Sequence, residues 1–267
     1  MDALSQIDGW EVDFAAAGVT SASATIATRG DTTRSVRLAS VSKPIAALAV
    51  LVAVEEGALE LDEPAGPPGS TVRHLLAHAS GLPFEGVVAL APAGRRRIYS
   101  NAGFSVLGEH LTRRTGIPFA DYVSEAVCAP LRIGLDPEGH PGAGMHGCLD
   151  DVLVIGRELL RPTLLAPETH RELVAVQFPG LDGVLPEFGR FSPLDWGLGV
   201  ELFGGKRPHW AGTQLSRASF GHYGGSGTFL WVDPVRGLAC AVLTTRPFGD
   251  WAKQAWPALS DAVVGAA

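Results

Sequence analysis

The feature that most constrains this chain is a serine and a lysine three residues apart, placed just before a long apolar run. Ser40 and Lys43 belong to the stretch Ser-Val-Ser-Lys-Pro, and ten consecutive apolar residues follow at 45–54. Residues three apart share one face of a helix, so the two side chains can point the same way. Pro44 has no N–H to donate to the carbonyl of Ser40, which places Ser40 at the helix N-terminus, before an irregular first turn. A run that is apolar on every face predicts a buried helix.

This pairing suits nucleophilic chemistry. A serine hydroxyl becomes a good nucleophile when a nearby base removes its proton. A lysine in an apolar site has a lowered pKa and can act as that base. The free N–H groups of a helix N-terminus favour a developing oxyanion. The same pattern also describes an ordinary buried helix that begins after a serine cap, so the catalytic interpretation needs support from other segments.

Size and charge exclude several classes of protein. The chain has 267 residues, of which 46% are hydrophobic and 18% charged, as expected for one large globular domain or two closely joined lobes. A formal net charge of −7 argues against nucleic-acid binding, which needs a basic face. The only basic run is Arg95-Arg96-Arg97, which is interpreted as a solvated loop.

The chain shows no secretion or membrane signal and no pattern typical of a metal site. Its first residues lack a basic start followed by an apolar run, and the longest apolar run is too short to cross a bilayer. Cys128, Cys148 and Cys240 are widely spaced and odd in number, which favours buried reduced thiols over disulfides or zinc. We therefore expect a cytoplasmic protein with no cofactor, no metal and no membrane partner.

Strand signals occupy both ends of the chain and helix signals its middle. This order predicts an α/β (α+β) fold, in which one antiparallel sheet is built from both chain ends and an all-helical lobe is inserted between them. The helix after Ser40 and a C-terminal helix cover the sheet, and the cleft lies at the seam between the lobes. Residues 1–60 together with 190–267 are assigned to the sheet lobe and 61–189 to the helical lobe. Strands are expected near 9–14, 22–28, 35–38, 196–203, 218–222, 228–232 and 238–243, and helices near 40–56, 70–78, 101–115, 119–128, 150–160, 167–176 and 251–264.

Two further segments support the catalytic interpretation. One is Tyr99-Ser100-Asn101, and the other is His222-Tyr223-Gly224, at the end of an expected strand and followed by Gly-Ser-Gly-Thr. With residues 40–43, and in this order, they resemble the motifs of the penicillin-recognising serine hydrolases, which include class C β-lactamases, DD-peptidases, D-aminopeptidases and esterases. The stretches 71–83 and 229–234 are similar as well. The resemblance covers most of the chain, is weakest at the N-terminus and across 175–195, and implies a two-lobe β-lactamase-like fold.

The resemblance implies a role for each matching residue. Ser40 would take the acyl group, Lys43 would manage its proton, and Tyr99 would act as general base or acid toward Ser40 and the leaving group. The backbone N–H groups of Ser40 and Gly225 would form the oxyanion hole. Asn101 would orient Lys43 or bind the amide on the acyl side of the substrate.

Two residues of the third segment depart from the family pattern. His222 stands where β-lactamases usually have lysine, and Tyr223 where they have threonine or serine. Together with Gly224 these residues are expected to bind substrate, and positive charge on Lys43 and His222 would help the Tyr99 phenol to ionise. Because histidine is only partly charged at neutral pH and tyrosine is bulky, the departures favour an esterase acting on a small ester or amide over a β-lactamase.

Other functions remain open from the sequence. The alternatives are a β-lactamase, a peptidase or amidase of D-amino acid substrates, an acyltransferase, and a non-catalytic binding module of the same ancestry. His74 and His78 have the spacing of a zinc pair, but no glutamate follows His74 and no third ligand is evident, so packing is the preferred interpretation. No serine lies in a Gly-x-Ser-x-Gly motif, which argues against an α/β-hydrolase. The sequence identifies neither the substrate nor the oligomeric state.

Overall fold

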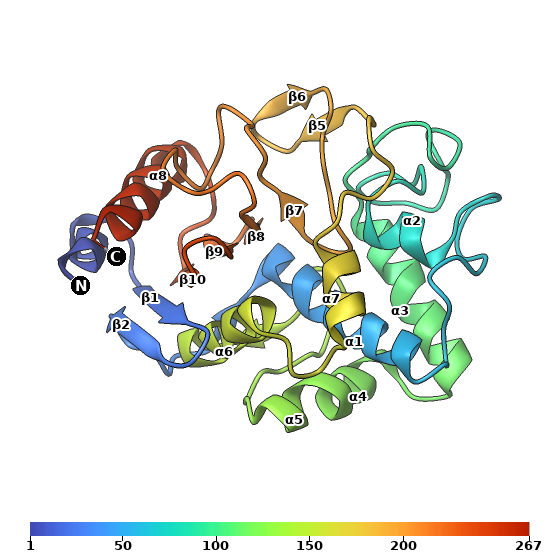
Figure 1. The fold of residues 1–267 in the computed structure, drawn as a ribbon, viewed down its shortest axis with the longest axis horizontal. Helices are drawn as coiled ribbons and strands as arrows, with labels where there is room; N and C mark the ends of the chain where they lie inside the picture. The colour runs from blue at the N-terminus through green and yellow to red at the C-terminus, as the bar shows by residue number, and fades with distance from the viewer. Residues whose placement is uncertain (267) are drawn as a thin grey trace.

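A six-stranded antiparallel sheet forms the centre of the structure, a computed structural model that describes residues 1–266 (Figure 1). The strand order is β2-β1-β10-β9-β8-β7, so the first two strands of the chain pair with its last strands. Two small two-stranded sheets, β3-β4 and β5-β6, lie outside it. The strands are β1 Ala15–Ser21, β2 Thr25–Arg29, β3 Val36–Arg37, β4 His146–Gly147, β5 Gly183–Leu185, β6 Gly189–Phe191, β7 Glu201–Leu202, β8 Phe220–Gly224, β9 Thr228–Asp233 and β10 Leu238–Thr244.

Helices cover both faces of this sheet. Alternate residues of β9 point to opposite sides, with Leu230 in the core that contains α1 and α6, and Trp231 in the core that contains α8 and the N-terminal turn η1. Helices α2 to α5 lie beyond α1 (Figure 1). The helical elements are η1 Asp2–Gly9, η2 Ala39–Val41, α1 Ser42–Glu55, α2 Val72–Leu76, α3 Asn101–Thr115, α4 Phe119–Val123, the π-helical segment η3 Ser124–Cys128, α5 Ala129–Leu131, α6 Leu149–Leu160, α7 Pro167–Leu173 and α8 Asp250–Gly265.

The expected sheet built from both chain ends is confirmed, but its first strand was wrongly placed. The segment 9–14 forms no strand, although the exposure of its residues alternates. It connects η1 to the first strand of the sheet. Strand β1 follows it instead, with the sequence Ala-Ala-Ala-Gly-Val-Thr-Ser. Small residues are needed there, since a Cβ on Gly18 would lie 2.7 Å from the side chain of Leu153 in α6. Propensity rules score alanine and glycine low in strands, and this explains the error.

Two other expected strands are much shorter or lie elsewhere. In place of a strand over 196–203, the chain forms the two-residue strand β7 after a turn. Gly199 in this turn has φ +77°, and a Cβ there would lie 2.4 Å from the Ala47 Cβ, so close contact with α1 shapes the turn. Strand β3 pairs with β4 and not with the main sheet.

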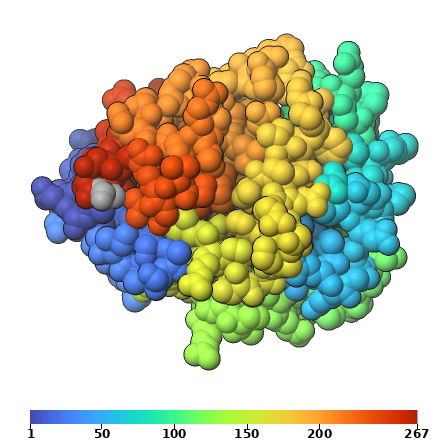
Figure 2. Space-filling view, viewed as in Figure 1, coloured from blue at the N-terminus to red at the C-terminus, as the bar shows by residue number. Residues whose placement is uncertain are grey.

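The chain ends lie together at one end of the molecule. Turn η1 packs against α8, and Figure 2 shows the first and last segments of the chain side by side. Helix α6 lies within residues 61–189 but packs on β1, β9 and β10, whereas α2 packs on α3. The lobe boundaries at residues 61 and 189 stay a prediction. None of the helices within 1–266 is both long enough and apolar enough to span a membrane.

Candidate active site

Ser40 lies in the 3₁₀ turn η2, immediately before α1, so the irregular start expected for this helix is confirmed. The preceding residue, Ala39, has φ +47°, a left-handed conformation that is rare for alanine and is held here by the surrounding structure. Ser226 Oγ donates to the Arg37 carbonyl at 2.8 Å, and Thr228 Oγ1 donates to the Leu38 carbonyl at 2.7 Å. The turn between β8 and β9 therefore fixes the segment that carries Ser40.

Lys43 lies fully buried one turn after Ser40, with its Nζ 3.1 Å from Ser40 Oγ. The amine donates to Asn101 Oδ1 at 2.7 Å and to the Gly142 carbonyl at 2.9 Å. Burial places the pKa of Lys43 well below its usual value. An uncharged amine has two N–H groups, and the two carbonyl oxygens account for both. Its lone pair is then left to face the Ser40 hydroxyl.

The Tyr99 hydroxyl donates to Ser40 Oγ at 2.7 Å from the other side. The next residue, Ser100, caps α3 by accepting from the Gly103 N–H, so the turn positions Tyr99 as well as starting the helix. Burial raises the pKa of Tyr99, and the hydrogen bond to Ser40 only partly offsets this rise. Burial therefore favours the neutral phenol, which differs from the ionised phenol expected from the sequence.

His222 is buried beside Tyr99 and is uncharged. Its Nδ1 donates to the Tyr223 carbonyl at 2.7 Å, which leaves Nε2 unprotonated and 3.5 Å from the Tyr99 hydroxyl. Burial and the neighbouring Lys43 lower the pKa of His222 to about 3. His222 therefore supplies no positive charge near neutral pH, contrary to the sequence-based expectation.

Tyr223 and Gly224 shape the wall beside the serine. The Tyr223 hydroxyl donates to the Pro186 carbonyl at 2.7 Å, so this polar group already has a partner. A Cβ on Gly224 would lie 2.4 Å from the Leu38 carbonyl oxygen, and glycine therefore permits β8 to approach the segment before Ser40. Gly225 follows at the strand end and lines the same cavity as Ser40.

Three openings surround these residues. A central cavity of about 260 Å³ lies over Ser40 and Gly225 and is walled by Tyr99 and His222. A side groove of about 540 Å³ continues from it and shares Phe84, Tyr99 and Pro186 with it. The remaining opening, of about 460 Å³, also borders Ser40. We call it the Asn101 opening, because it is lined by Ser40, Phe84, Asn101 and Gly225 but not by Tyr99.

Several residues near the site belong to no recognisable sequence motif, so they could not be identified from the sequence. Gly142 supplies a backbone carbonyl to Lys43, and a Cβ there would lie 2.8 Å from Phe104, so only glycine fits. The Gly142 N–H donates to His140 Nδ1 at 3.0 Å, and His140 Nε2 lies 2.8 Å from Ser105 Oγ in α3. Because Nδ1 accepts, His140 carries its proton on Nε2. His140 thus binds the N–H of the same residue whose carbonyl accepts a hydrogen bond from Lys43.

Glu201 was also missed, although it lines the central cavity together with His222. Its side chain is 1% exposed and is bound by Lys206 at 3.0 Å, His209 at 3.1 Å and Trp210 Nε1 at 2.9 Å. Burial raises the pKa of this carboxyl, but Lys206, His209 and Trp210 together lower it well below its usual value. Glu201 therefore remains ionised at the centre of a buried polar network.

The two histidines considered as a zinc pair, His74 and His78, are held by packing and hydrogen bonds. His78 Nδ1 accepts from the Ser100 N–H at 3.1 Å and its ring packs on Tyr99, whereas His74 lies next to Thr71 and stacks on Phe178. No group of three or more histidine, cysteine or carboxylate side chains within residues 1–266 is arranged to hold a metal ion.

The basic run at 95–97 is only partly a solvated loop. Arg95 and Arg96 are exposed, but Arg97 is buried. The Arg97 guanidinium donates to the carbonyls of Ala77 and Gln177. The expectation of a solvated loop is therefore wrong for Arg97, whose side chain ties two backbone segments together.

Comparisons with known proteins show the family to which the chain belongs. The chain is 52% identical to a beta-lactamase of Mycobacterium bovis whose crystal structure superposes with a TM-score of 0.97, covering 99% of this chain and 98% of that one. It is 27% identical to the esterase EstB of Burkholderia gladioli, over 85% of this chain and 81% of EstB. An unliganded simvastatin synthase from Aspergillus terreus shares the fold, with a TM-score of 0.79 at 17% identity, over 98% of this chain and 96% of that one. The sequence profile of the beta-lactamase family matches residues 5–136 and 131–263. The chain therefore belongs to the beta-lactamase family.

Proposed function

We propose that the protein is a serine hydrolase that cleaves a small ester through an acyl-enzyme intermediate on Ser40. The observation that carries this proposal is the convergence of two groups on one oxygen. Lys43 Nζ lies 3.1 Å from Ser40 Oγ, and the Tyr99 hydroxyl lies 2.7 Å from it. A base and an acid are thus both within hydrogen-bond reach of the nucleophile.

The protons balance over one cycle. Lys43 takes the Ser40 proton as Oγ attacks the carbonyl carbon, and the N–H groups of Ser40 and Gly225 stabilise the oxyanion. Tyr99 then gives its proton to the departing oxygen, and the proton held by Lys43 replaces it. The carbon–oxygen bond to the leaving alcohol breaks, and an ester to Ser40 remains. Water reverses these transfers, which releases the acid and returns the proton to Ser40.

The surroundings of His222 favour ester over β-lactam substrates. In the β-lactamases that the sequence resembles, a lysine charge and a small hydroxyl at these two positions help to hold the substrate carboxylate. Here His222 is uncharged and the Tyr223 hydroxyl is bonded to Pro186. Similarity to an esterase supports the same choice. An amide substrate, or transfer of the acyl group to an alcohol or amine instead of water, would use the same intermediate.

Covalent labelling tests the proposed nucleophile. A fluorophosphonate probe should add one adduct per chain, as measured by intact mass, because an activated serine attacks phosphorus as it attacks a carbonyl. Ser40→Ala should abolish the adduct, and replacement of the exposed Ser23 by alanine should leave it unchanged. A folded wild-type protein that takes no label would favour a non-catalytic binding module instead.

A second prediction concerns how the lysine is positioned. His140→Ala should lower kcat for p-nitrophenyl acetate about tenfold with little change in KM, because it removes the hydrogen bond that fixes Gly142, the residue whose carbonyl orients Lys43. His140→Asn should recover most of the activity, since its Oδ1 can accept from the Gly142 N–H where Nδ1 did. His140→Gln lacks that acceptor position and should not recover. Equal kcat in the alanine and asparagine variants would contradict the role.

A further inference from the structure

The side groove lies beside the part of the site that handles the leaving group. In an acyl-enzyme mechanism the group that protonates the leaving oxygen must reach it directly. Tyr99 lines the central cavity and the side groove, but it does not line the Asn101 opening. A leaving group that stays within reach of the Tyr99 hydroxyl therefore extends toward the side groove. The acyl part is left with the Asn101 opening.

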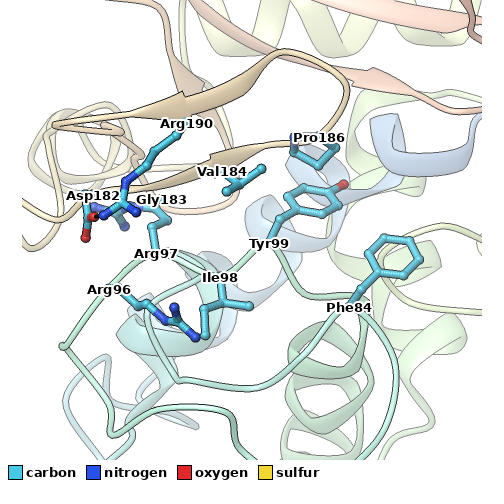
Figure 3. A pocket seen from close by; sticks show the side chains of 10 residues that line it. All are labelled: Phe84, Arg96, Arg97, Ile98, Tyr99, Asp182, Gly183, Val184, Pro186 and Arg190. Atoms are coloured by element: carbon cyan, nitrogen blue, oxygen red, sulfur yellow. Dashed lines mark hydrogen bonds and ion pairs between the residues drawn. The ribbon is translucent and has the colours of Figure 1, made fainter.

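The walls of the side groove are apolar near Tyr99. Ile98 and Val184, from two different segments, line the groove (Figure 3). Pro186 and Phe84 flank the end of the groove that is nearest the Tyr99 hydroxyl (Figure 3). Val184 is 57% exposed and Phe84 is 51% exposed, so these apolar side chains are available to a ligand. The groove volume of about 540 Å³ is much more than an acetyl or methyl group fills. An aromatic or similarly large apolar alcohol fits its size and chemistry.

The far end of the groove is positively charged. Arg96 and Arg190 both lie on the side away from the Tyr99 hydroxyl (Figure 3). Arg190 is paired with Asp182, but Arg96 has no hydrogen bond or ion pair with any residue in 1–266. Arg97 also lines the groove but is buried and donates to backbone carbonyls. Even without it, two arginines against one aspartate leave a local excess of positive charge in a chain whose formal net charge is −7. Such a local field attracts an anionic group.

We propose that the side groove binds the leaving group of the substrate and selects an apolar alcohol that carries an acidic group, such as a carboxylate. This inference rests on the proposed function, because it assigns one half of the ester to the groove. Arg96 is the specificity-determining residue, and Arg190 assists it. Arg96 and Arg190 in the side groove thus supply a positive charge that His222 does not provide.

Two matched esters test this inference. One is 7-acetoxy-4-methylcoumarin, which is neutral, and the other is 7-acetoxycoumarin-4-acetic acid, which is anionic at pH 7.5. The wild-type ratio of kcat/KM, anionic over neutral, should be about 5 to 10 at low ionic strength and should fall toward 2 in 0.5 M NaCl. Arg96→Gln should bring the ratio close to 1, and Arg96→Glu should bring it below 1. Arg95 is the matched control because it is exposed but does not line the groove, so Arg95→Gln should leave the ratio unchanged.

A binding measurement separates this inference from the proposed function. In Ser40→Ala protein, 7-hydroxycoumarin-4-acetic acid should bind about fivefold more tightly than 7-hydroxy-4-methylcoumarin, as followed by fluorescence titration, and Arg96→Gln should remove the difference. A preference in binding without ester turnover would retain the groove assignment and overturn the hydrolase. Turnover of both esters without preference, or an equal effect of the Arg95 and Arg96 substitutions, would overturn the groove assignment alone.

Discussion

Replacing Lys43 with methionine is expected to lower kcat/KM for p-nitrophenyl acetate by about 10³-fold or more. Methionine is close to lysine in length but cannot accept the Ser40 proton. It also leaves the Asn101 side-chain oxygen and the Gly142 carbonyl without their donor. Lys253→Met on the surface of α8 is the control, and its activity should stay within about twofold of wild type.

The pH dependence of the wild-type enzyme provides a second measurement of the same role. Only uncharged Lys43 can take a proton, so kcat/KM should rise with pH through one ionisation that lies well below the usual pKa of lysine. Burial raises the pKa of Tyr99, so no loss of activity should follow up to pH 10. His222, with a pKa of about 3, stays neutral between pH 5 and 10 and adds no step. A bell-shaped profile with a second pKa near 7, or a methionine variant with nearly full activity, would rule out Lys43 as the base.

Replacing Glu201 with alanine is expected to be the most destabilising of the substitutions considered, at about 3–5 kcal/mol of unfolding free energy. The change removes the only carboxylate that contacts Lys206, His209 and Trp210 within residues 1–266, and it leaves a buried ammonium without a counter-charge. Glu201→Gln should cost less, because its amide can still hydrogen-bond. Urea unfolding followed by circular dichroism measures both changes.

The control for this prediction is an ion pair on the surface. Glu168 pairs with Arg171 in α7, where both side chains are mostly exposed, so Glu168→Ala should change stability by less than about 0.5 kcal/mol. A cost below 1 kcal/mol for Glu201→Ala would show that the network contributes little. Because Glu201 pairs with Gly221 across β7 and β8, next to His222, the alanine variant should also lose activity.

The sequence predicted the parts of the site that depend on local spacing. Residues three apart must share a helix face, so placing Ser40 and Lys43 together needed no knowledge of the fold. Tyr99 and Gly225 are far from Ser40 in the chain, and only family resemblance associated them with it. The structure brings the Tyr99 hydroxyl to Ser40, and Gly225 lines the cavity over it.

Other parts of the site could not be predicted because they use groups that every residue carries. The Gly142 carbonyl is a backbone atom, and nothing in the sequence marks one carbonyl as the acceptor for Lys43. Burial likewise depends on the whole fold, and the sequence therefore misjudged the charge of His222 and the ionisation of Tyr99. Strand β1 was misplaced for a related reason. Its small residues are required by close packing against α6, and their low strand propensity concealed the strand.

The way Lys43 is held has a consequence for the energetics of the reaction. Burial disfavours the ammonium form of Lys43, Tyr99 favours its phenol form and His222 is neutral, so the surroundings disfavour formal charge on all three groups. In the proposed mechanism, the ammonium on Lys43 and the oxyanion arise together when the serine attacks. The hydrogen-bond donors and acceptors fixed around these groups then stabilise the charges of the transition state more than those of the ground state. A neutral ester can enter such a site without displacing a counter-ion.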